Sequence, residues 1–150
     1  DSTIFTGLED GRILWVALDG SFRELANTGG RPLGMELDKV MRRLIVADAS
    51  RGLLAITPKG EIEVLTDTVD GEKILFADDV AVAADGTIWF SDASTDHGYQ
   101  ANLYNFLEGR PTGRLLSYSP GNRQTRVRMD GLFFANGVAM GPGDEYVLVT

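Results

Sequence analysis

The sequence predicts an all-β fold: a six-bladed β-propeller of which this chain supplies about half, three to three and a half blades. Short apolar runs alternate with turns along nearly all of the 150 residues, 18 of which are glycine. A four-strand pattern recurs with a spacing of 44 residues, measured from Asp48 to Asp92, and this is the length of a propeller blade. Helical periodicity is confined to one short segment.

The expected strands are short and are separated by turn pairs such as Asp10-Gly11 and Lys59-Gly60. They lie at about 4–6, 13–17, 35–37, 44–47, 53–56, 62–65, 80–83, 87–91, 115–118, 127–129, 138–140 and 146–150. Trp15 and Trp89 fall inside strands, and we expect them to pack between blades.

Three segments align as the innermost strands of successive blades, beginning at Gly34, Asp79 and Gly137. Each is followed by a second strand, and complete units add a third strand that opens with glycine and a fourth after a turn. The resulting blades are expected at about 1–26, 31–66, 76–130 and 133–150. Together they form the N-terminal portion of a single propeller domain.

A half-disc of this kind would leave two open sheet edges and an exposed apolar face. We therefore expect the remaining half of the propeller to come from the same, longer chain. Domain swapping with a second chain is the less favoured alternative.

The third blade carries an insertion of about 17 residues, with a helical segment expected at about 96–110. Its apolar residues fall at helical spacing: Tyr99, Leu103, Phe106 and Leu107. Asp96 is expected to cap the start of this helix, and Gly109 and Pro111 to end it. Two interpretations stay open, a helix packed over the end of the propeller and a lid that bounds a substrate pocket.

Composition excludes several functional classes. The 14 basic and 22 acidic residues give a net charge of −8, which argues against a nucleic-acid partner. No apolar run is long enough to form a transmembrane segment in this portion. There is no cysteine and a single histidine, so a metal ion would have to be held by oxygen ligands.

The single histidine, His97, lies at the start of the insertion. We expect it to be a solvated loop residue, and the alternative is that it lines a pocket.

The starts of the inner strands form a ring at one mouth of a propeller, and the repeat gives this position three times: Leu33, Asp78 and Asn136. Carboxylate and amide oxygens that converge there suit a hard divalent cation, above all Ca²⁺. Asp79 is adjacent and could hydrogen-bond to the ligands of the ion or face a second ion. The alternative is that Asp and Asn only shape turns at the strand starts.

Asp48 and Asp92 are equivalent in the repeat at the exit of the second strand, and each is followed by Ala-Ser. We expect both to be structural and to accept hydrogen bonds from free amides of the turn. A Ser94–His97–Asp92 triad is poorly supported because residues so close in one loop rarely reach the required geometry.

The sequence also resembles a known family. The segments 113–120 and 130–139 resemble the signature of the strictosidine synthase-like family. Segments of the earlier blades show the same likeness: 31–34, 46–48, 52–54, 79–92, 107–109 and 112–114. The wider superfamily includes gluconolactonases, regucalcin and paraoxonases, all six-bladed propellers.

The resemblance implies two different chemistries. In the lactonase branches an axial Ca²⁺ is held by a first-blade Glu, two Asn and a later Asp. Asn136 matches the second Asn, Asp78 stands where the first is expected, and Asp79 matches the Asp that follows it. True strictosidine synthases instead condense an amine with an aldehyde, without a metal, using a late-blade Glu. These further acidic residues are expected before Asp1 and after Thr150.

The leading hypothesis is therefore a metal-dependent hydrolase that acts on a lactone or a related ester as its small-molecule substrate. Asp78 and Asn136 would be ligands of the ion, and Asp78 is the candidate catalytic base. A metal-free strictosidine synthase-type condensing enzyme is the second hypothesis. The third is a non-catalytic propeller that binds a partner through its loops.

Overall fold

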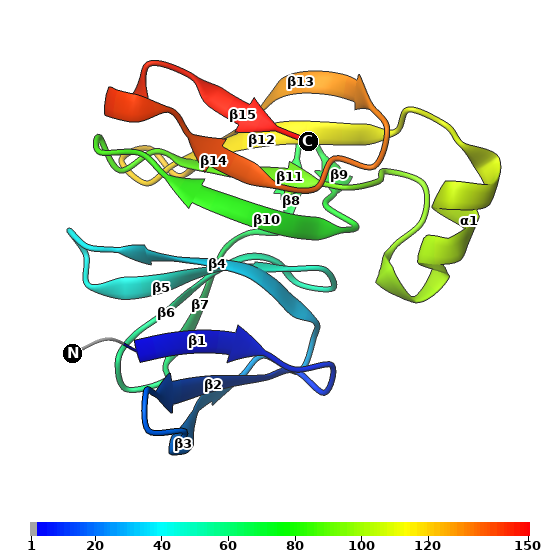
Figure 1. Cartoon of the computed structure of the whole chain (residues 1–150). Helices are drawn as coiled ribbons and strands as arrows, with labels where there is room; N and C mark the ends of the chain where they lie inside the picture. The colour runs from blue at the N-terminus through cyan, green and yellow to red at the C-terminus, as the bar shows by residue number, and fades with distance from the viewer. Residues whose placement is uncertain (1–2) are drawn as a thin grey trace.

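The computed structural model describes residues 3–150, which form four antiparallel sheets in chain order, a small hairpin and one short helix (Figure 1). The first sheet contains β1 (Thr3–Gly7), β2 (Arg12–Ala17) and β3 (Phe22–Asn27). The second contains β4 (Pro32–Asp38), β5 (Arg43–Asp48), β6 (Gly52–Ile56) and β7 (Ile62–Thr66).

The third sheet contains β10 (Ala77–Val82), β11 (Ile88–Asp92), β12 (Gly113–Ser119) and β13 (Gln124–Leu132). The last contains β14 (Val138–Met140) and β15 (Val147–Val149). A hairpin of β8 (Thr68–Val69) and β9 (Glu72–Lys73) joins the second and third sheets and has no counterpart in the sequence repeat. In every sheet each strand pairs with the next along the chain, as the alternation of apolar runs and turns predicts.

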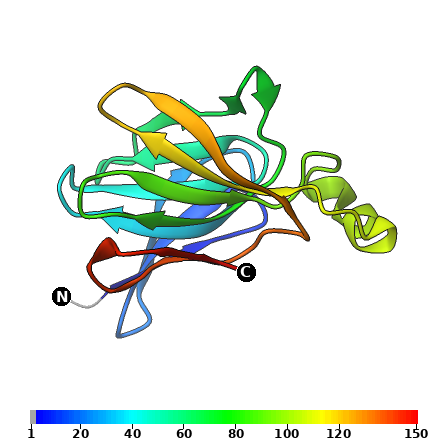
Figure 2. The same ribbon diagram turned by 90° about the horizontal axis from the view of Figure 1, so that it is seen from above.

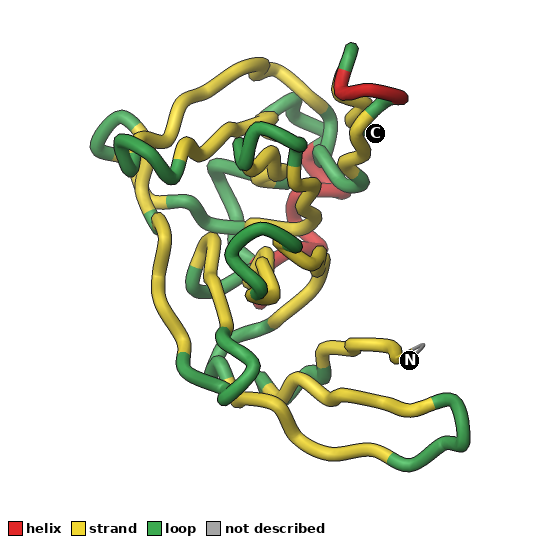
Figure 3. The backbone as a smooth tube through the Cα atoms, turned by 90° about the vertical axis from the view of Figure 1, so that its left-hand side faces the viewer, coloured by secondary structure: helices red, strands yellow, loops and turns green. Residues whose placement is uncertain are grey.

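The sheets are stacked face to face, and Figure 3 shows the chain following an open arc with its two termini at the ends. The core lies between the sheets. Ile45 and Leu53 of the second sheet pack with Phe90, Leu116 and Tyr118 of the third, and all five side chains are buried. Meandering antiparallel sheets packed in this way are propeller blades, so the prediction of a partial β-propeller is confirmed.

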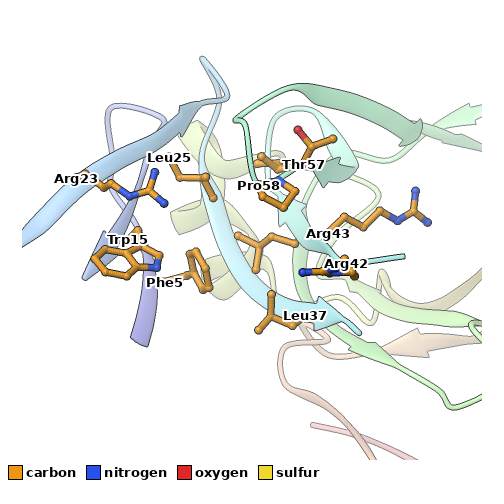
Figure 4. A pocket seen from close by; sticks show the side chains of 11 residues that line it. Phe5, Trp15, Arg23, Leu25, Leu37, Arg42, Arg43, Thr57 and Pro58 are labelled. Carbon is orange, nitrogen blue, oxygen red and sulfur yellow. The ribbon is translucent and has the colours of Figure 1, made fainter. Parts of the chain in front are cut away.

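The two tryptophans lie between sheets, as the sequence predicts. Trp89 packs with Val138 and Leu115 between the third and fourth sheets. Trp15 lines a cleft between the first and second sheets, with Arg23 stacked 5.1 Å from the ring centroid (Figure 4). Apolar and aromatic side chains therefore form contacts between neighbouring blades.

The insertion contains a 3₁₀ turn (Tyr99–Ala101) followed by α1 (Asn102–Glu108), which projects beyond the ends of the strands, to the right in Figures 1 and 2. Gly109 ends the helix with a φ of 58°, as predicted. The prediction that Asp96 caps its start is wrong. The Asp96 carboxylate instead lies 2.6 Å from Arg110, and no side chain caps the first turn.

The apolar face of α1 does not pack against the described residues over most of its length. Leu103, Phe106 and Leu107 are 63%, 61% and 71% exposed. Tyr99, in the preceding 3₁₀ turn, packs inward, edge to face with Phe76 at a centroid distance of 5.9 Å. Between residues 3 and 150 no helix has the length and apolar character needed to cross a membrane.

Candidate functional site

The starts of the inner strands β4, β10 and β14 border one pocket of about 390 Å³, which we call the inner-strand pocket. Leu33, Asp78 and Asn136, the three positions equivalent in the repeat, all line it. Thr6, Arg31 and Asp79 complete its polar side chains. The repeat thus brings together residues that are 45 and 58 positions apart in the sequence.

Asp78 is half-buried and carries a perturbed carboxyl group. Burial raises its pKa to about 6, the neighbouring Asp79 charge adds to the rise, and the Arg31 guanidinium opposes it. Among residues 3–150, no hydrogen-bond donor reaches this carboxylate. Its oxygens are therefore available to a ligand that enters the pocket.

Asn136 is positioned through its backbone. Its N–H donates to the Thr150 carbonyl at 2.7 Å, and its carbonyl accepts a 2.6 Å hydrogen bond from Ser91 Oγ. The side-chain amide is exposed and makes no hydrogen bond within the described part of the chain. The main chain is fixed while the amide oxygen remains free for a ligand.

Asp79 links two blades. Its Oδ2 accepts a 2.8 Å hydrogen bond from the Val138 N–H, and its own N–H donates to Ser91 Oγ at 3.0 Å. Any side chain at Gly34 would collide with the Asp79 carboxylate, so glycine is required there. Through Val138 and Ser91, Asp79 positions the segment that carries Asn136.

Arg31 was not singled out by the sequence, although it begins the segment Arg31-Pro32-Leu33-Gly34. Its guanidinium stacks on Tyr99 of the insertion at 5.4 Å, and Nη1 donates to the Pro32 carbonyl at 3.3 Å. Nε is buried and has no hydrogen-bond partner among residues 3–150. No acidic group of this part of the chain lies within ion-pair distance of it. The repeat does not reveal such a residue because its neighbour Tyr99 comes from an insertion.

An aromatic cluster joins the insertion to the loop before β14. Phe134 contacts Phe76 at a centroid distance of 5.3 Å and Phe106 at 4.5 Å. Phe134 has a φ of 53°, a conformation that a bulky residue adopts only when its surroundings hold it there. The insertion is thereby fixed at the end of the propeller where the inner-strand pocket opens.

His97 does not line the inner-strand pocket. Its Nε2 lies 3.2 Å from Glu108 Oε1, and its ring packs near Tyr104 within the insertion. Ser94 Oγ donates to Asn105 Oδ1 at 2.7 Å rather than to the imidazole. No Ser94–His97–Asp92 triad forms, because Asp92 is bound elsewhere.

Asp48 and Asp92 are both fully buried and accept backbone hydrogen bonds, as a structural role requires. Asp48 accepts amides of its own turn as predicted, whereas the backbone donor to Asp92 comes from the segment before β10. Asp48 Oδ1 accepts the N–H groups of Arg31 and Ser50, each at 2.9 Å. Asp92 Oδ1 accepts the Phe76 N–H at 2.9 Å, and Oδ2 pairs with Arg114 at 2.6 Å. Burial raises the pKa of Asp92, and Arg114 opposes the rise.

The polar groups of the pocket fit a hard cation in type but form only part of a ligand set. Asp78 and Asn136 offer free oxygens from two neighbouring blades. Residues 3–150 contain no group of three or more His, Cys, Asp or Glu side chains arranged to hold a metal ion. Ca²⁺ takes six to eight oxygen ligands, so these two side chains supply a minority of a coordination shell.

Comparison with known proteins identifies relatives along the whole chain. A family model described as strictosidine synthase matches residues 78–150. Strictosidine synthase-like 4 of Arabidopsis thaliana is 41% identical over 149 residues, which cover 95% of this chain and 40% of that protein. The adipocyte plasma membrane-associated protein of Gallus gallus is 36% identical over 164 residues, covering 97% of this chain and 39% of that protein.

Solved structures show the same fold. A gluconolactonase from Xanthomonas campestris superposes with a TM-score of 0.79 at 21% identity, covering 99% of this chain and 50% of the other. A second structure, a putative gluconolactonase, gives a TM-score of 0.73 at 24% identity over 94% of this chain and 48% of the other. The chain spans about 40% of the length of the sequence relatives. The sequence matches show that this chain is similar to strictosidine synthase-like proteins, and the structural matches show that it has the propeller fold.

Proposed function

We propose that the propeller containing these residues is a metal-dependent hydrolase of a lactone or a related ester. The observation that carries the proposal is the position of Asp78 and Asn136, whose free oxygens line one pocket from equivalent inner-strand starts. Two solved structures of the same fold are described as a gluconolactonase and a putative gluconolactonase. This description supports the choice of substrate class.

In this proposal Asp78 and Asn136 hold a divalent cation, with Ca²⁺ the best match to a carboxylate and an amide oxygen. When bound, such an ion polarises a carbonyl and stabilises the negative charge that develops on its oxygen. Asp79 keeps the Asn136 segment in place through Val138 and Ser91. It contributes to geometry rather than to the reacting atoms.

Asp78 would also receive a proton from the attacking water. A carboxylate has two oxygens, so one can face the cation while the other accepts the proton. Burial raises its pKa to about 6 in the absence of a metal, and a bound cation would lower it, so the group is ionised at neutral pH and can accept a proton. The proposal therefore gives a single residue two roles.

The test measures calcium binding by calorimetry and hydrolysis of a lactone panel with the full-length protein. We expect Asn136→Ala to weaken calcium binding and hydrolysis by at least tenfold. Asn122→Ala is the matched control, because Asn122 lies in an exposed turn between β12 and β13. Absence of calcium binding together with unchanged lactone hydrolysis in Asn136→Ala would contradict the proposal.

The same preparation separates the two other hypotheses. A condensing enzyme would join tryptamine-like amines to aldehydes, and its activity would survive chelation. A non-catalytic binding module would turn over neither the lactones nor the amine and aldehyde pair. Either result would replace the hydrolase assignment.

A further inference from the structure

We propose that Arg31 binds an anionic group of the substrate, and that a carboxylate is the chemical class that it recognises. The proposal adds substrate recognition to the hydrolase assignment. That the bound anion belongs to a substrate rests on that assignment. The binding of a carboxylate by Arg31 can nevertheless be tested without turnover. The inference makes Arg31 a specificity-determining residue of the inner-strand pocket.

The first support is the position of an unneutralised cation. Arg31 lines a pocket that holds Asp78 and Asp79, yet no ion pair joins its guanidinium to an acidic group within residues 3–150. Its charge nevertheless acts on Asp78, whose carboxylate it stabilises. The guanidinium is therefore close to Asp78 but forms no ion pair with it.

The second support is the hydrogen-bond pattern of the guanidinium. Nη1 donates to the Pro32 carbonyl and Nε is buried without a partner, while Nη2 makes no hydrogen bond in the described chain. Nη2 is therefore the donor that remains for a carboxylate entering the pocket, through a charge-assisted hydrogen bond.

The third support is preorganisation. Tyr99 stacks against the guanidinium at 5.4 Å, and Phe76 packs edge to face against Tyr99. Stacking fixes the plane of the guanidinium, so less side-chain entropy is lost when a ligand binds. Part of the insertion therefore serves the pocket through Arg31.

A structural alternative involves Asp48. Its Oδ1 accepts the Arg31 backbone N–H, while its buried Oδ2 has no partner within residues 3–150. A small shift or a bridging water would join Asp48 Oδ2 to Arg31 Nε. If that contact were the whole purpose of the guanidinium, replacement of Arg31 would alter stability and leave ligand discrimination unchanged.

The experiment compares 4-hydroxybutyrate with 4-hydroxybutanamide, which differ in charge but hardly in size. Calorimetry with the full-length protein in chelator measures both dissociation constants, so that a calcium ion does not itself bind the carboxylate. We expect the carboxylate to bind at least tenfold more tightly than the amide. Arg31→Gln should abolish this ratio, and Arg31→Lys should retain part of it because the charge remains.

Arg23→Gln is the matched control, since Arg23 also stacks on an aromatic ring but lines the separate cleft of Figure 4. It should leave the ratio unchanged. Equal affinity for acid and amide in the wild type, or a ratio that survives in folded Arg31→Gln, would overturn the inference. Thermal melts identify the folded variants, and Arg31→Lys provides the test if Arg31→Gln does not fold.

The outcomes for the two proposals are distinguishable. Arg31-dependent carboxylate binding without lactone hydrolysis would retain the inference about recognition and reject the hydrolase. Hydrolysis of lactones without Arg31-dependent discrimination would support the hydrolase assignment and reject the inference about Arg31.

Discussion

At the scale of single residues, neighbouring aspartates in the same strand have different surroundings and different roles. Asp79 is fixed by hydrogen bonds to the next blade, whereas Asp78 faces the pocket without a hydrogen-bond partner among residues 3–150. Burial raises the pKa of the free carboxyl group to about 6. One carboxylate holds the site together, and the other is available for chemistry.

Asp79→Ala should destabilise the full-length protein by about 1–3 kcal/mol, because the Val138 N–H loses its acceptor in a partly buried setting. Chemical denaturation measures the loss. Asp19→Ala is the control, since Asp19 bonds only within its own exposed turn. An equal, small loss in both variants would show that the link between the blades carries little free energy.

Asp78→Asn should stabilise the calcium-free protein at high pH and not at low pH. A carboxyl group with a raised pKa favours the folded state while protonated, and this stability is lost as pH rises from about 4 through about 6. The rise from 3.8 to about 6 would correspond to roughly 3 kcal/mol. Because solvent screens a part-exposed group, the expected difference in the free energy of unfolding is about 1 kcal/mol.

Denaturation in chelator at pH 4.5 and pH 8 tests this expectation. The advantage of the variant over the wild type should be larger at pH 8 than at pH 4.5, and the variant should bind calcium more weakly at pH 8. A stability difference that is the same at both pH values would show that Asp78 is not perturbed by its surroundings.

The sequence predicted the approach of Asp78 and Asn136 because equivalent positions in a repeat occupy equivalent places in space. It did not predict Arg31. The role proposed for Arg31 depends on Tyr99, which lies outside the repeat, and on three-dimensional packing that leaves the guanidinium without an ion pair among residues 3–150.

At the scale of elements, the insertion is anchored by polar contacts as well as by the aromatic cluster. Asn105 accepts a hydrogen bond from Ser94 Oγ at 2.7 Å and donates one to the His97 carbonyl at 3.0 Å. The amphipathic spacing predicted a helix here, and α1 confirms it. The spacing could not predict which side would be covered, since Leu103 and Leu107 remain exposed. Asp96 does not cap the helix because its carboxylate pairs with Arg110.

Asn105→Ala should loosen the insertion while leaving the blades intact. Hydrogen exchange followed by mass spectrometry should show faster exchange over about 96–110, with little change in the global melting temperature. The control is Asn102→Ala, because the Asn102 side chain makes no hydrogen bond within residues 3–150. Uniform acceleration across the blades would instead mean that Asn105 supports the whole fold.

At the scale of the whole molecule, neighbouring blades are joined by apolar packing and by acidic side chains that reach backbone amides. Glu36 Oε2 of the second blade accepts the Val82 N–H of β10 at 2.7 Å. Asp144 Oδ2 of the fourth blade accepts the Ala84 N–H at 2.5 Å. Period and turn chemistry predicted the blades, but not these links, because the partners are 46 and 60 residues apart.

Glu36→Ala should lower the free energy of unfolding of the full-length protein by about 1 kcal/mol, since an inter-blade hydrogen bond is lost at a solvent-exposed position. Glu36→Gln should lose less, because the amide keeps an oxygen acceptor. Combining Glu36→Ala with Asp144→Ala tests whether both neighbours hold the third blade cooperatively. A loss larger than the sum of the two single variants would show coupling through this blade. Strict additivity would show that each blade interface contributes independently, as in repeat proteins whose stability is a sum over neighbouring units.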